Sequence, residues 1–433
     1  MCRKKIETKA VLNYFRIIRN TNGGQVLRNN TKGRFCSPAV LNIFTPILSI
    51  ITNLFILIKQ RAAGIDSLIS VNFHSDHSSY ICLTKFRMME LGIGMFGDNH
   101  YDTDGKPQSP GERLKELIEE IRLMDEVGLD FFGIGEHHRP DYAVSTPEII
   151  LAAACSVTNK IKLGSAVSVL SSSDPVKLYQ SFATLDLLSN GRAELMAGRG
   201  SFIESFPLFG YNLDDYDQLF EEKLELLLKI NHENPVTWKG KFRPALNKQL
   251  VLPRAVNDHL NIWIAVGGTP ESVLRAGKHG LPVIFAIIGG NPAQFKPLFE
   301  YYKNVYQHFK HDMSKFQVGV HMHALFGDDS RKIADEYYPV YSSQMNRVGR
   351  SRGWPPYQPQ QYETGRTRNG HLVVGDANES IDKILYMHEL FGLTRFSAHM
   401  DVGGPSHQSL MKSIEIFGTK IAPKVREALK VSN

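Results

Sequence analysis

Short apolar runs recur along residues 89–433, and segments with a helical period separate most of them. Eight runs have the length and composition of buried strands: Leu91–Phe96, Phe131–Gly135, Ile161–Leu170, Arg192–Ala197, Ile262–Val266, Val283–Ile288, Val318–Phe326 and Arg395–Met400. Strands that alternate with helices are typical of a parallel sheet. Eight such units close a barrel. We therefore predict an α/β fold, a (β/α)8 TIM barrel, with an open doubly wound sheet as the competing arrangement.

The helical segments are recognised by period and by their first residues. Glu112–Val127 and Asp215–Ile230 each place apolar residues on one face. Five helix starts share a capping residue followed by proline: Ser109-Pro110, Thr146-Pro147, Asp174-Pro175, Thr269-Pro270 and Asn291-Pro292. The cap accepts a hydrogen bond from a free backbone N–H, and proline loses nothing at the first helical position because its nitrogen would be unpaired there anyway.

Two connections are longer than a simple crossover needs. The one between the fourth and fifth predicted strands contains VTWKGKF, which predicts a short hairpin. The one between the seventh and eighth contains Arg350–Gly370, rich in Pro, Gln, Arg and Tyr. We predict that this second insertion is a long excursion over the barrel mouth, mobile or ordered by a ligand.

Residues 1–87 differ in character from the rest. They contain an apolar run, Leu41–Ile58, but six polar or helix-breaking residues interrupt it, which weakens a membrane-spanning interpretation. The pattern changes abruptly at Met88-Met89. We therefore predict that 1–87 is an N-terminal extension, disordered or not part of the functional protein, and that 88–433 is the barrel; a membrane anchor and a structured domain remain alternatives.

Charge follows the same division. The whole chain has 50 Lys and Arg and 44 Asp and Glu, of which residues 1–87 hold 13 and three, so residues 88–433 have 37 basic and 41 acidic side chains. The overall charge of +6 therefore does not indicate a nucleic-acid partner. Four Cys without a CxxC pair indicate neither a disulfide scaffold nor a zinc site. We expect a cytoplasmic protein.

The carboxyl ends of barrel strands carry the active sites of this fold, so residues there are the candidates. After the fourth strand stands Arg199, flanked by two glycines and followed by Ser201; after the fifth stand Gly267, Gly268 and Thr269, which open a helix. Glycine lets backbone N–H groups approach an anion, a helix N-terminus attracts it, and arginine adds a fixed charge. Because the two strands are neighbours, we predict a phosphate site, although each half alone is equally a helix-starting turn.

Other candidates lie on four further strands. Glu136, His137 and His138 follow the second strand, and at most one of the two histidines should face the site. Ala166 and Val167 lie in a run of small residues on the third strand that could support a flat ring or could simply fit a narrow barrel. The pairs His321 with His323 and His399 with Asp401 allow a metal-dependent hydrolase as an alternative, but we predict no metal.

Taken together and in order, these motifs resemble the bacterial luciferase-like, flavin-dependent monooxygenase superfamily. The carriers are GIGEHH at 133–138, LGSAV at 163–167, FATLDLLSNGR at 182–192, AGRGS at 197–201 and VGGTPES at 266–272. The resemblance spans Met89 to about Leu429 and none of residues 1–87.

The resemblance implies a TIM barrel that binds reduced FMN, supplied by a separate flavin reductase, and uses O2 to oxidise a small organic substrate. It implies that His137, with His138 beside it, is the catalytic base, that Ala166 and Val167 form a non-proline cis peptide under the flavin ring, and that Arg199, Ser201, Gly267, Gly268 and Thr269 contact the cofactor. Coenzyme F420 is the alternative cofactor, and a flavin-binding protein without catalysis is a further class. Family members often form homodimers, so a homodimer is the assembly to test.

Overall fold

The structure is a computed structural model and describes residues 88–431 except 103 and 201. The chain divides into two units, Met1–Leu83 and Thr84–Asn433, and all described residues belong to the second. The predicted N-terminal extension, including the apolar run Leu41–Ile58, lies outside the described residues. Within the described part, no helix combines the length and the apolar character needed to cross a bilayer.

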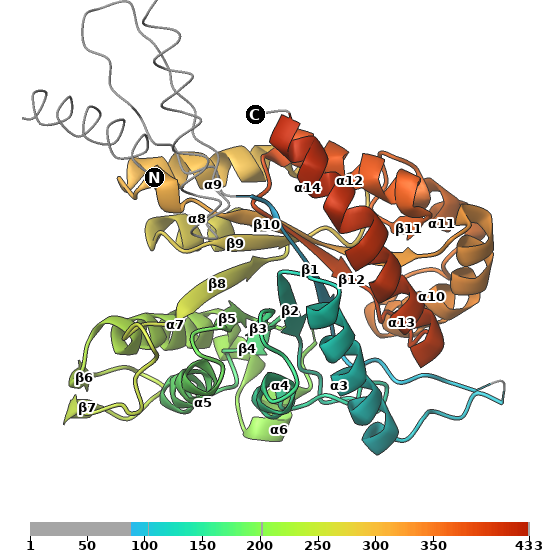
Figure 1. Ribbon diagram of the computed structural model, residues 1–433. Coiled ribbons are helices and arrows are strands. Elements are labelled where there is room, and N and C mark those ends of the chain that lie inside the picture. The colour runs from blue at the N-terminus through green and yellow to red at the C-terminus, as the bar shows by residue number, and fades with distance from the viewer. Residues whose placement is uncertain (1–87, 103, 201, 432–433) are drawn as a thin grey trace, which may run out of the picture. The chain divides into compact units, whose positions relative to one another are not determined.

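Parallel strands form a closed barrel with helices around it (Figure 1). The eight strands of the barrel, called staves below, follow one another around the barrel in chain order, and the third consists of β3 with its continuation β4. β10 closes the sheet by pairing with both β9 and β12. This pairing confirms the (β/α)8 TIM barrel and excludes the open sheet. The strands of the barrel are β1 (Glu90–Met95), β2 (Phe131–Ile134), β3 (Lys162–Ser165), β4 (Ser168–Val169), β5 (Ala193–Gly198), β8 (Asn261–Val266), β9 (Val283–Ala286), β10 (Val318–Phe326) and β12 (Arg395–His399).

The third predicted strand is continuous in the sequence but interrupted in the structure. A cis peptide joins Ala166 to Val167, and β3 ends before it while β4 begins after it. β3 pairs with β2 and β5, whereas β4 pairs with β5 alone. The chain therefore leaves the sheet at the level of the barrel mouth.

The helices begin where the sequence predicts. At all five predicted positions a helix starts with the proline, although at Pro292 the helix is a short 3-10 turn. The caps Ser109, Asp174 and Asn291 accept backbone hydrogen bonds, whereas Thr146 and Thr269 do not. The helices are α3 (Pro110–Glu126), α4 (Pro147–Cys155), α5 (Pro175–Leu188), α6 (Ser205–Phe209), α7 (Tyr216–His232), α8 (Pro270–Lys278), α9 (Lys296–His308), α10 (Ser330–Arg352), α11 (Pro359–Arg366), α12 (Ala377–Phe391), α13 (His407–Ile416) and α14 (Ala422–Val431).

Both predicted insertions exist, and the second contains regular elements. The predicted hairpin is β6 (Val236–Trp238) with β7 (Leu246–Gln249), which projects beyond α7 (Figure 1). In the second insertion α10 extends to Arg352, α11 occupies part of the segment Arg350–Gly370, and β11 (Val373–Gly375) extends the sheet beside β10. The sequence predicted the insertion but not these elements within it.

A buried ion network fills the amino end of the barrel. Arg395 is almost fully buried, donates to Glu90 and to Glu194 Oε2 at 2.7 Å, and has its guanidinium 4.0 Å from the Trp263 ring centroid. Lys162 bridges the same two carboxylates at 2.6 and 3.3 Å. All four charged groups lie at or near the first residues of their strands. They close this end, so a ligand cavity must lie at the other.

Candidate functional site

A cavity of about 270 Å³ opens at the carboxyl ends of the strands. Residues on seven of the eight staves, or in the segments that directly follow them, line it. The lining residues used below are Phe96, Glu136, His137, Ala166, Val167, Gly198, Arg199, Gly267, Ser272, Ala286 and His321. Candidates after the second, third, fourth and fifth staves therefore share one cavity at the end of the barrel where active sites lie. The candidates His138, Gly268 and Thr269 are not among its lining residues.

Arg199 lies directly beside the start of α8. Its Nη2 donates to Ser272 Oγ at 3.4 Å, and that oxygen bonds Thr269 Oγ1 at 2.9 Å. Its Nη1 donates to Asp217 Oδ1 at 2.6 Å, and Asp217 is 72% exposed. The loops after β5 and β8 thus bring the predicted cation and the predicted helix N-terminus together. A water-exposed carboxylate holds the arginine in place without removing it from the cavity.

The first turn of α8 suits an anion. Thr269 is the residue before the helix, but its side chain bonds Ser272 rather than capping the backbone, so among the described residues no side chain accepts the free N–H groups of this turn. Gly268 has φ 119°, a conformation reserved for glycine, and no atom lies within 4 Å of the place where a Cβ of Gly267 would stand. This open space beside unpaired donors fits a phosphate group. Ser201 lies outside the described residues.

The cis peptide between Ala166 and Val167 forms one wall of the cavity. A Cβ on Gly198 would stand 2.7 Å from Val167, and one on Gly133 would stand 2.8 Å from Ala166. The neighbouring strands therefore need glycine here for the two side chains to fit. The result is an apolar surface next to Met196 and Ile284, which suits contact with a ring system.

The two histidines of the Glu136-His137-His138 segment differ, as strand geometry predicts. His137 lines the cavity, is 7% exposed and packs against Phe96 and Tyr142. Its Nε2 is buried and has no hydrogen-bond partner among the described residues. Its Nδ1 lies 3.8 Å from Glu204 Oε1. Burial lowers the pKa of His137, although Glu204 opposes the shift, so the ring is neutral at pH 7. His138 does not line this cavity and packs against Phe209.

Two residues that line the cavity, Glu136 and His321, had no role in it predicted from the sequence. Glu136 is buried and accepts the Val169 N–H at 3.1 Å, and burial raises the pKa of Glu136 to about 8, so its carboxyl is mostly protonated at pH 7. His321, considered only as a metal ligand, lines the inner part of the cavity instead. Its position on β10 could have indicated this place, because alternate side chains of a barrel strand point to the inside of the barrel.

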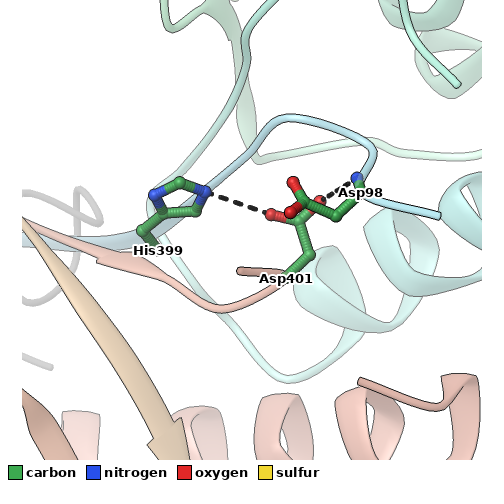
Figure 2. Close-up of side chains that lie close together, drawn as sticks. All are labelled: Asp98, His399 and Asp401. Carbon is green, nitrogen blue, oxygen red and sulfur yellow. Dashed lines mark hydrogen bonds and ion pairs between the residues drawn. The ribbon is translucent and has the colours of Figure 1, made fainter. Parts of the chain in front are cut away.

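The acid–histidine cluster that could bind a metal is Asp98, His399 and Asp401 (Figure 2). Asp401 accepts N–H groups from Phe96, Gly97 and Asp98 at 2.7 to 3.2 Å, and His399 Nε2 lies 3.2 Å from it. Burial raises the pKa of Asp98 well above its ordinary value, and the neighbouring Asp401 raises it further. The Asp401 carboxylate is thus saturated by donors, and Asp98 is held neutral, which is a poor donor set for a cation.

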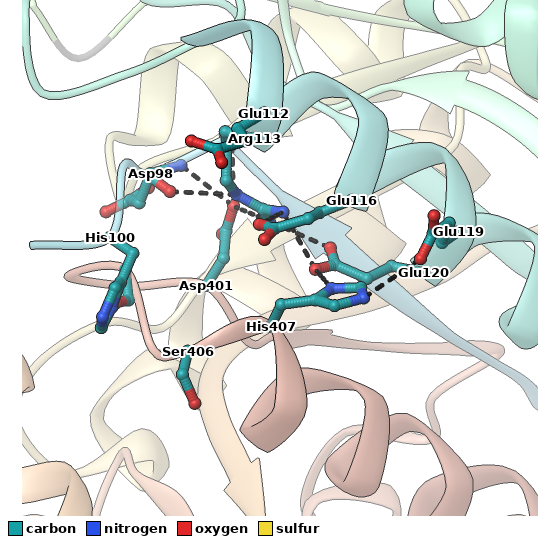
Figure 3. A network of polar contacts seen from close by, with 12 residues as sticks. Asp98, His100, Glu112, Arg113, Glu116, Glu119, Glu120, Asp401, Ser406 and His407 are labelled. Atoms are coloured by element: carbon teal, nitrogen blue, oxygen red, sulfur yellow. Dashed lines mark hydrogen bonds and ion pairs between the residues drawn. The ribbon is translucent and has the colours of Figure 1, made fainter. Parts of the chain in front are cut away.

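A second acidic group, centred on Glu120, is equally occupied (Figure 3). Arg113 donates to both Glu120 oxygens at 2.9 Å, and His407 Nδ1 lies 2.9 Å from one of them. Arg113 Nη2 also lies 3.9 Å from Asp401, so the same guanidinium interacts with Glu120 and with Asp401. These contacts join α3 to the start of α13 and to the loop after β12, and they do not favour the metal-dependent hydrolase.

Comparison with known proteins identifies relatives along most of the described chain. The protein y4vJ of Sinorhizobium fredii is 24% identical over 339 residues, which is 75% of this chain and 95% of the relative. The 4-hydroxyprotoasukamycin monooxygenase of Streptomyces nodosus is 22% identical over 337 residues, covering 74% of this chain and 90% of the relative.

Solved structures share the fold at low identity. The monooxygenase RslO1 of Streptomyces bottropensis superposes with a TM-score of 0.68 at 21% identity, over 78% of this chain and 99% of that one. The oxygenating constituent of the 3,6-diketocamphane monooxygenase of Pseudomonas putida, solved with FMN, gives 0.62 at 20% identity over the same shares. The coenzyme F420-dependent tetrahydromethanopterin reductase of Methanopyrus kandleri gives 0.60 at 17%, again over 78% and 99%.

The family comparison decides the identity that the barrel and its cavity leave open. Residues 89–394 match the luciferase-like monooxygenases, a range that contains the cavity residues described above. The chain belongs to the luciferase-like monooxygenase family.

Proposed function

We propose that this chain is an FMN-dependent monooxygenase that uses reduced flavin and O2 to oxidise a small organic substrate. The observation that carries the proposal is the composition of one cavity. A cation and the uncapped turn of α8 lie at one part of it, and the flat apolar Ala166–Val167 wall lies at another. A flavin mononucleotide has an anionic tail and a flat ring, which match these two parts. The diketocamphane monooxygenase of the same fold was solved with FMN.

Each part of the cavity has a distinct task. Arg199 and the first turn of α8 bind the phosphate, since a guanidinium and free N–H groups both favour an anion. The apolar wall orients the ring and excludes water. When bound, reduced FMN supplies the two electrons that allow one oxygen atom of O2 to enter the substrate while the other leaves as water. His137, neutral and with a free Nε2, accepts or returns a proton at the mouth.

The partners follow from this chemistry. A separate flavin reductase supplies the reduced cofactor, and the reaction belongs in the cytoplasm, where reduced nicotinamide is available to that reductase. A homodimer is the assembly we propose for the chain, on the strength of the family. Size-exclusion chromatography with light scattering tests this last proposal, and a monodisperse monomer of 48.8 kDa would contradict it.

The decisive experiment compares two flavins that differ only in the phosphate. Arg199→Ala is expected to raise the Kd of FMN by about tenfold to a hundredfold, since a hydrogen bond to a charged group contributes about 1.5–3 kcal/mol. The Kd of riboflavin, which has no phosphate, should stay within about twofold. Fluorescence quenching of each flavin measures both constants.

Arg243→Ala is the matched control. Arg243 also pairs with an aspartate, Asp174, at 2.8 Å, but it does not line the cavity, so its removal should change neither constant. Equal weakening of FMN and riboflavin by Arg199→Ala would contradict the phosphate contact. Tight binding of coenzyme F420 with no binding of FMN would assign the F420-dependent alternative, which the fold of the Methanopyrus kandleri reductase keeps open.

Testing the role of His137 requires an assay of turnover. We expect His137→Gln to lower kcat by about a hundredfold or more, because a positioned acid or base contributes 10²–10⁴-fold. The Kd of FMN should change little. The variant is assayed with a flavin reductase and a substrate identified by screening, and oxidised product is counted against NADH consumed. His138→Gln is the control, since His138 lies outside the cavity; parental turnover by the His137 variant would remove the role.

A further inference from the structure

A second cavity, of about 750 Å³, lies beside the loop that follows β9. Its walls include Ile288 and Gly289 of that loop, Met345 of α10, and Trp354 and Tyr357 of the segment between α10 and α11. The volume falls within the range of about 300–1,000 Å³ that is typical of small-molecule sites. This second cavity therefore has room for a small organic molecule.

Two large apolar side chains in its walls remain open to solvent. Trp354 is 47% exposed and Ile288 is 44% exposed. Apolar surface left in water is unfavourable by about 25 cal/mol per Å². A ligand that enters the second cavity can reach both side chains, and it gains affinity if its own surface is apolar.

The lining of the second cavity carries no formal charge at pH 7. Among the described residues that line it, none is Asp, Glu, Lys or Arg. Burial, helped by the nearby Lys383, lowers the pKa of His371 to about 4, so this lining histidine is neutral. The other polar side chains are amides and hydroxyls, such as Gln361 and Thr364. A charged ligand would lose hydration here without meeting a counter-charge, so the lining favours an uncharged one.

The chain at the end of β9 takes part in both cavities. Ala286 lines the cavity proposed for FMN, called the cofactor cavity below, and Ile288 lines the second cavity. Between them, the Ile287 N–H still bonds the His321 carbonyl oxygen at 3.0 Å, so the chain continues along β10. Two residues of extended chain span about 7 Å. The two cavities thus adjoin at this short stretch of chain.

A chain of side-chain contacts also connects Trp354 to His137. The guanidinium carbon of Arg352, at the end of α10, lies 5.2 Å from the Trp354 ring centroid and 5.6 Å from that of Phe202. Phe202 in turn packs against His137, with ring centroids 4.8 Å apart. Trp354 is therefore two side chains away from the residue proposed to transfer protons.

Resting on the proposed function, we propose that the second cavity binds the organic substrate and that this substrate is an uncharged, largely apolar ring compound that packs on Trp354. An exposed indole favours a ring, because aromatic surfaces in contact add to the free energy of apolar burial. The adjoining positions of Ala286 and Ile288 bring substrate and cofactor together at the carboxyl end of the barrel. Trp354 and Ile288 are then residues that determine specificity.

Three naphthalene probes test the site without the natural substrate. Naphthylmethanol is uncharged, naphthoate is an anion and naphthylmethylamine is a cation at pH 7. Isothermal titration calorimetry on the full chain gives each Kd. Naphthylmethanol should bind the parent at least about tenfold more tightly than either charged probe. Trp354→Ala should raise its Kd by about tenfold and Ile288→Ala by about threefold, whereas Trp354→Phe keeps a ring and should recover most of the affinity.

Phe309→Ala is the matched control for the loss of an exposed aromatic side chain. Phe309 follows α9 and is 43% exposed, but it lines neither the second cavity nor the cofactor cavity. Its removal should leave the Kd of naphthylmethanol unchanged. All of these variants should bind FMN with the parental Kd.

A turnover assay connects the probe to the substrate. With a substrate identified by screening, Trp354→Ala should raise KM by about tenfold and change kcat little, and naphthylmethanol should compete with that substrate. Inhibition that does not depend on substrate concentration would overturn the substrate role of the second cavity.

The binding outcomes separate the two proposals. Equal Kd values of naphthylmethanol for the parent and Trp354→Ala, with tight FMN binding by the parent, would overturn the second cavity as substrate site and leave the proposed function intact. Tighter binding of a charged probe would overturn the substrate class. A parent chain that binds naphthylmethanol but no FMN would overturn the proposed function and, with it, the substrate role.

Discussion

Glu136 is a carboxyl group enclosed by apolar surroundings at the mouth of the barrel. Burial raises its pKa to about 8, so it is protonated in the folded protein at pH values where an unfolded chain has ionised it. A folded-state pKa above the unfolded value of 4.5 means that the group's contribution to stability is complete below pH 4.5 and is lost as the pH rises toward 8. The protein should therefore lose stability across this interval.

The variant Glu136→Gln removes that dependence. Glutamine keeps an oxygen that can accept the Val169 N–H and cannot ionise. We expect the variant to be more stable than the parent by about 4 kcal/mol at pH 8 and by only about 1 kcal/mol at pH 5. Urea unfolding at both pH values gives the free energies. Glu126→Gln, at an exposed position of α3, is the control; parallel pH profiles for Glu136→Gln and the parent would contradict the assignment.

At the level of single residues the sequence predicted contacts that follow from strand order. Arg199 and Thr269 lie on neighbouring staves, and the structure joins them through Ser272. It did not predict the partner Asp217, because an exposed acid 18 residues away on α7 carries no local signal. The protonation of Glu136 was also beyond prediction, since it depends on burial by residues from other loops.

At the level of elements, the strand predictions succeeded because each stave is a short buried apolar run between turn residues. The break in the third stave was not visible in its apolar pattern and came only from the family resemblance. α11 was missed because it is short and polar and because Pro355 and Pro356 stand just before it. Its start nevertheless had a readable signal: Pro359 is the first helical residue, and the Gln361 side chain accepts the Gln358 N–H at 2.7 Å.

For the whole molecule, we expect low pH to reduce stability through the ion network at the amino end of the barrel. Burial alone would raise the pKa of Glu194, but Arg395 and Lys162 lower it to about 2. A folded-state pKa below the ordinary 4.5 means that the stabilisation is present above pH 4.5 and is lost as the pH falls toward 2. The staves of the first, third, fourth and eighth units all contribute to this network, so its loss should destabilise the entire barrel.

Glu194→Gln tests this expectation. The variant leaves part of the buried Arg395 charge unpaired and should be less stable than the parent by about 3 kcal/mol at pH 7. The difference should shrink toward pH 3, because the parent loses the same interaction there. Denaturant unfolding over this range measures it, with the exposed Glu336→Gln on α10 as control. A difference that stays constant with pH would show that Glu194 acts through packing and not through its charge.

The buried ion network of Arg395, Lys162 and their two carboxylates has a consequence for how ligands reach the barrel. These charged side chains occupy the amino end of the barrel, and the cavity described above opens at the carboxyl ends of the strands. Under the proposed function, cofactor and substrate therefore enter and leave from the same side of the barrel. Their binding and release have to follow a fixed order wherever their paths overlap.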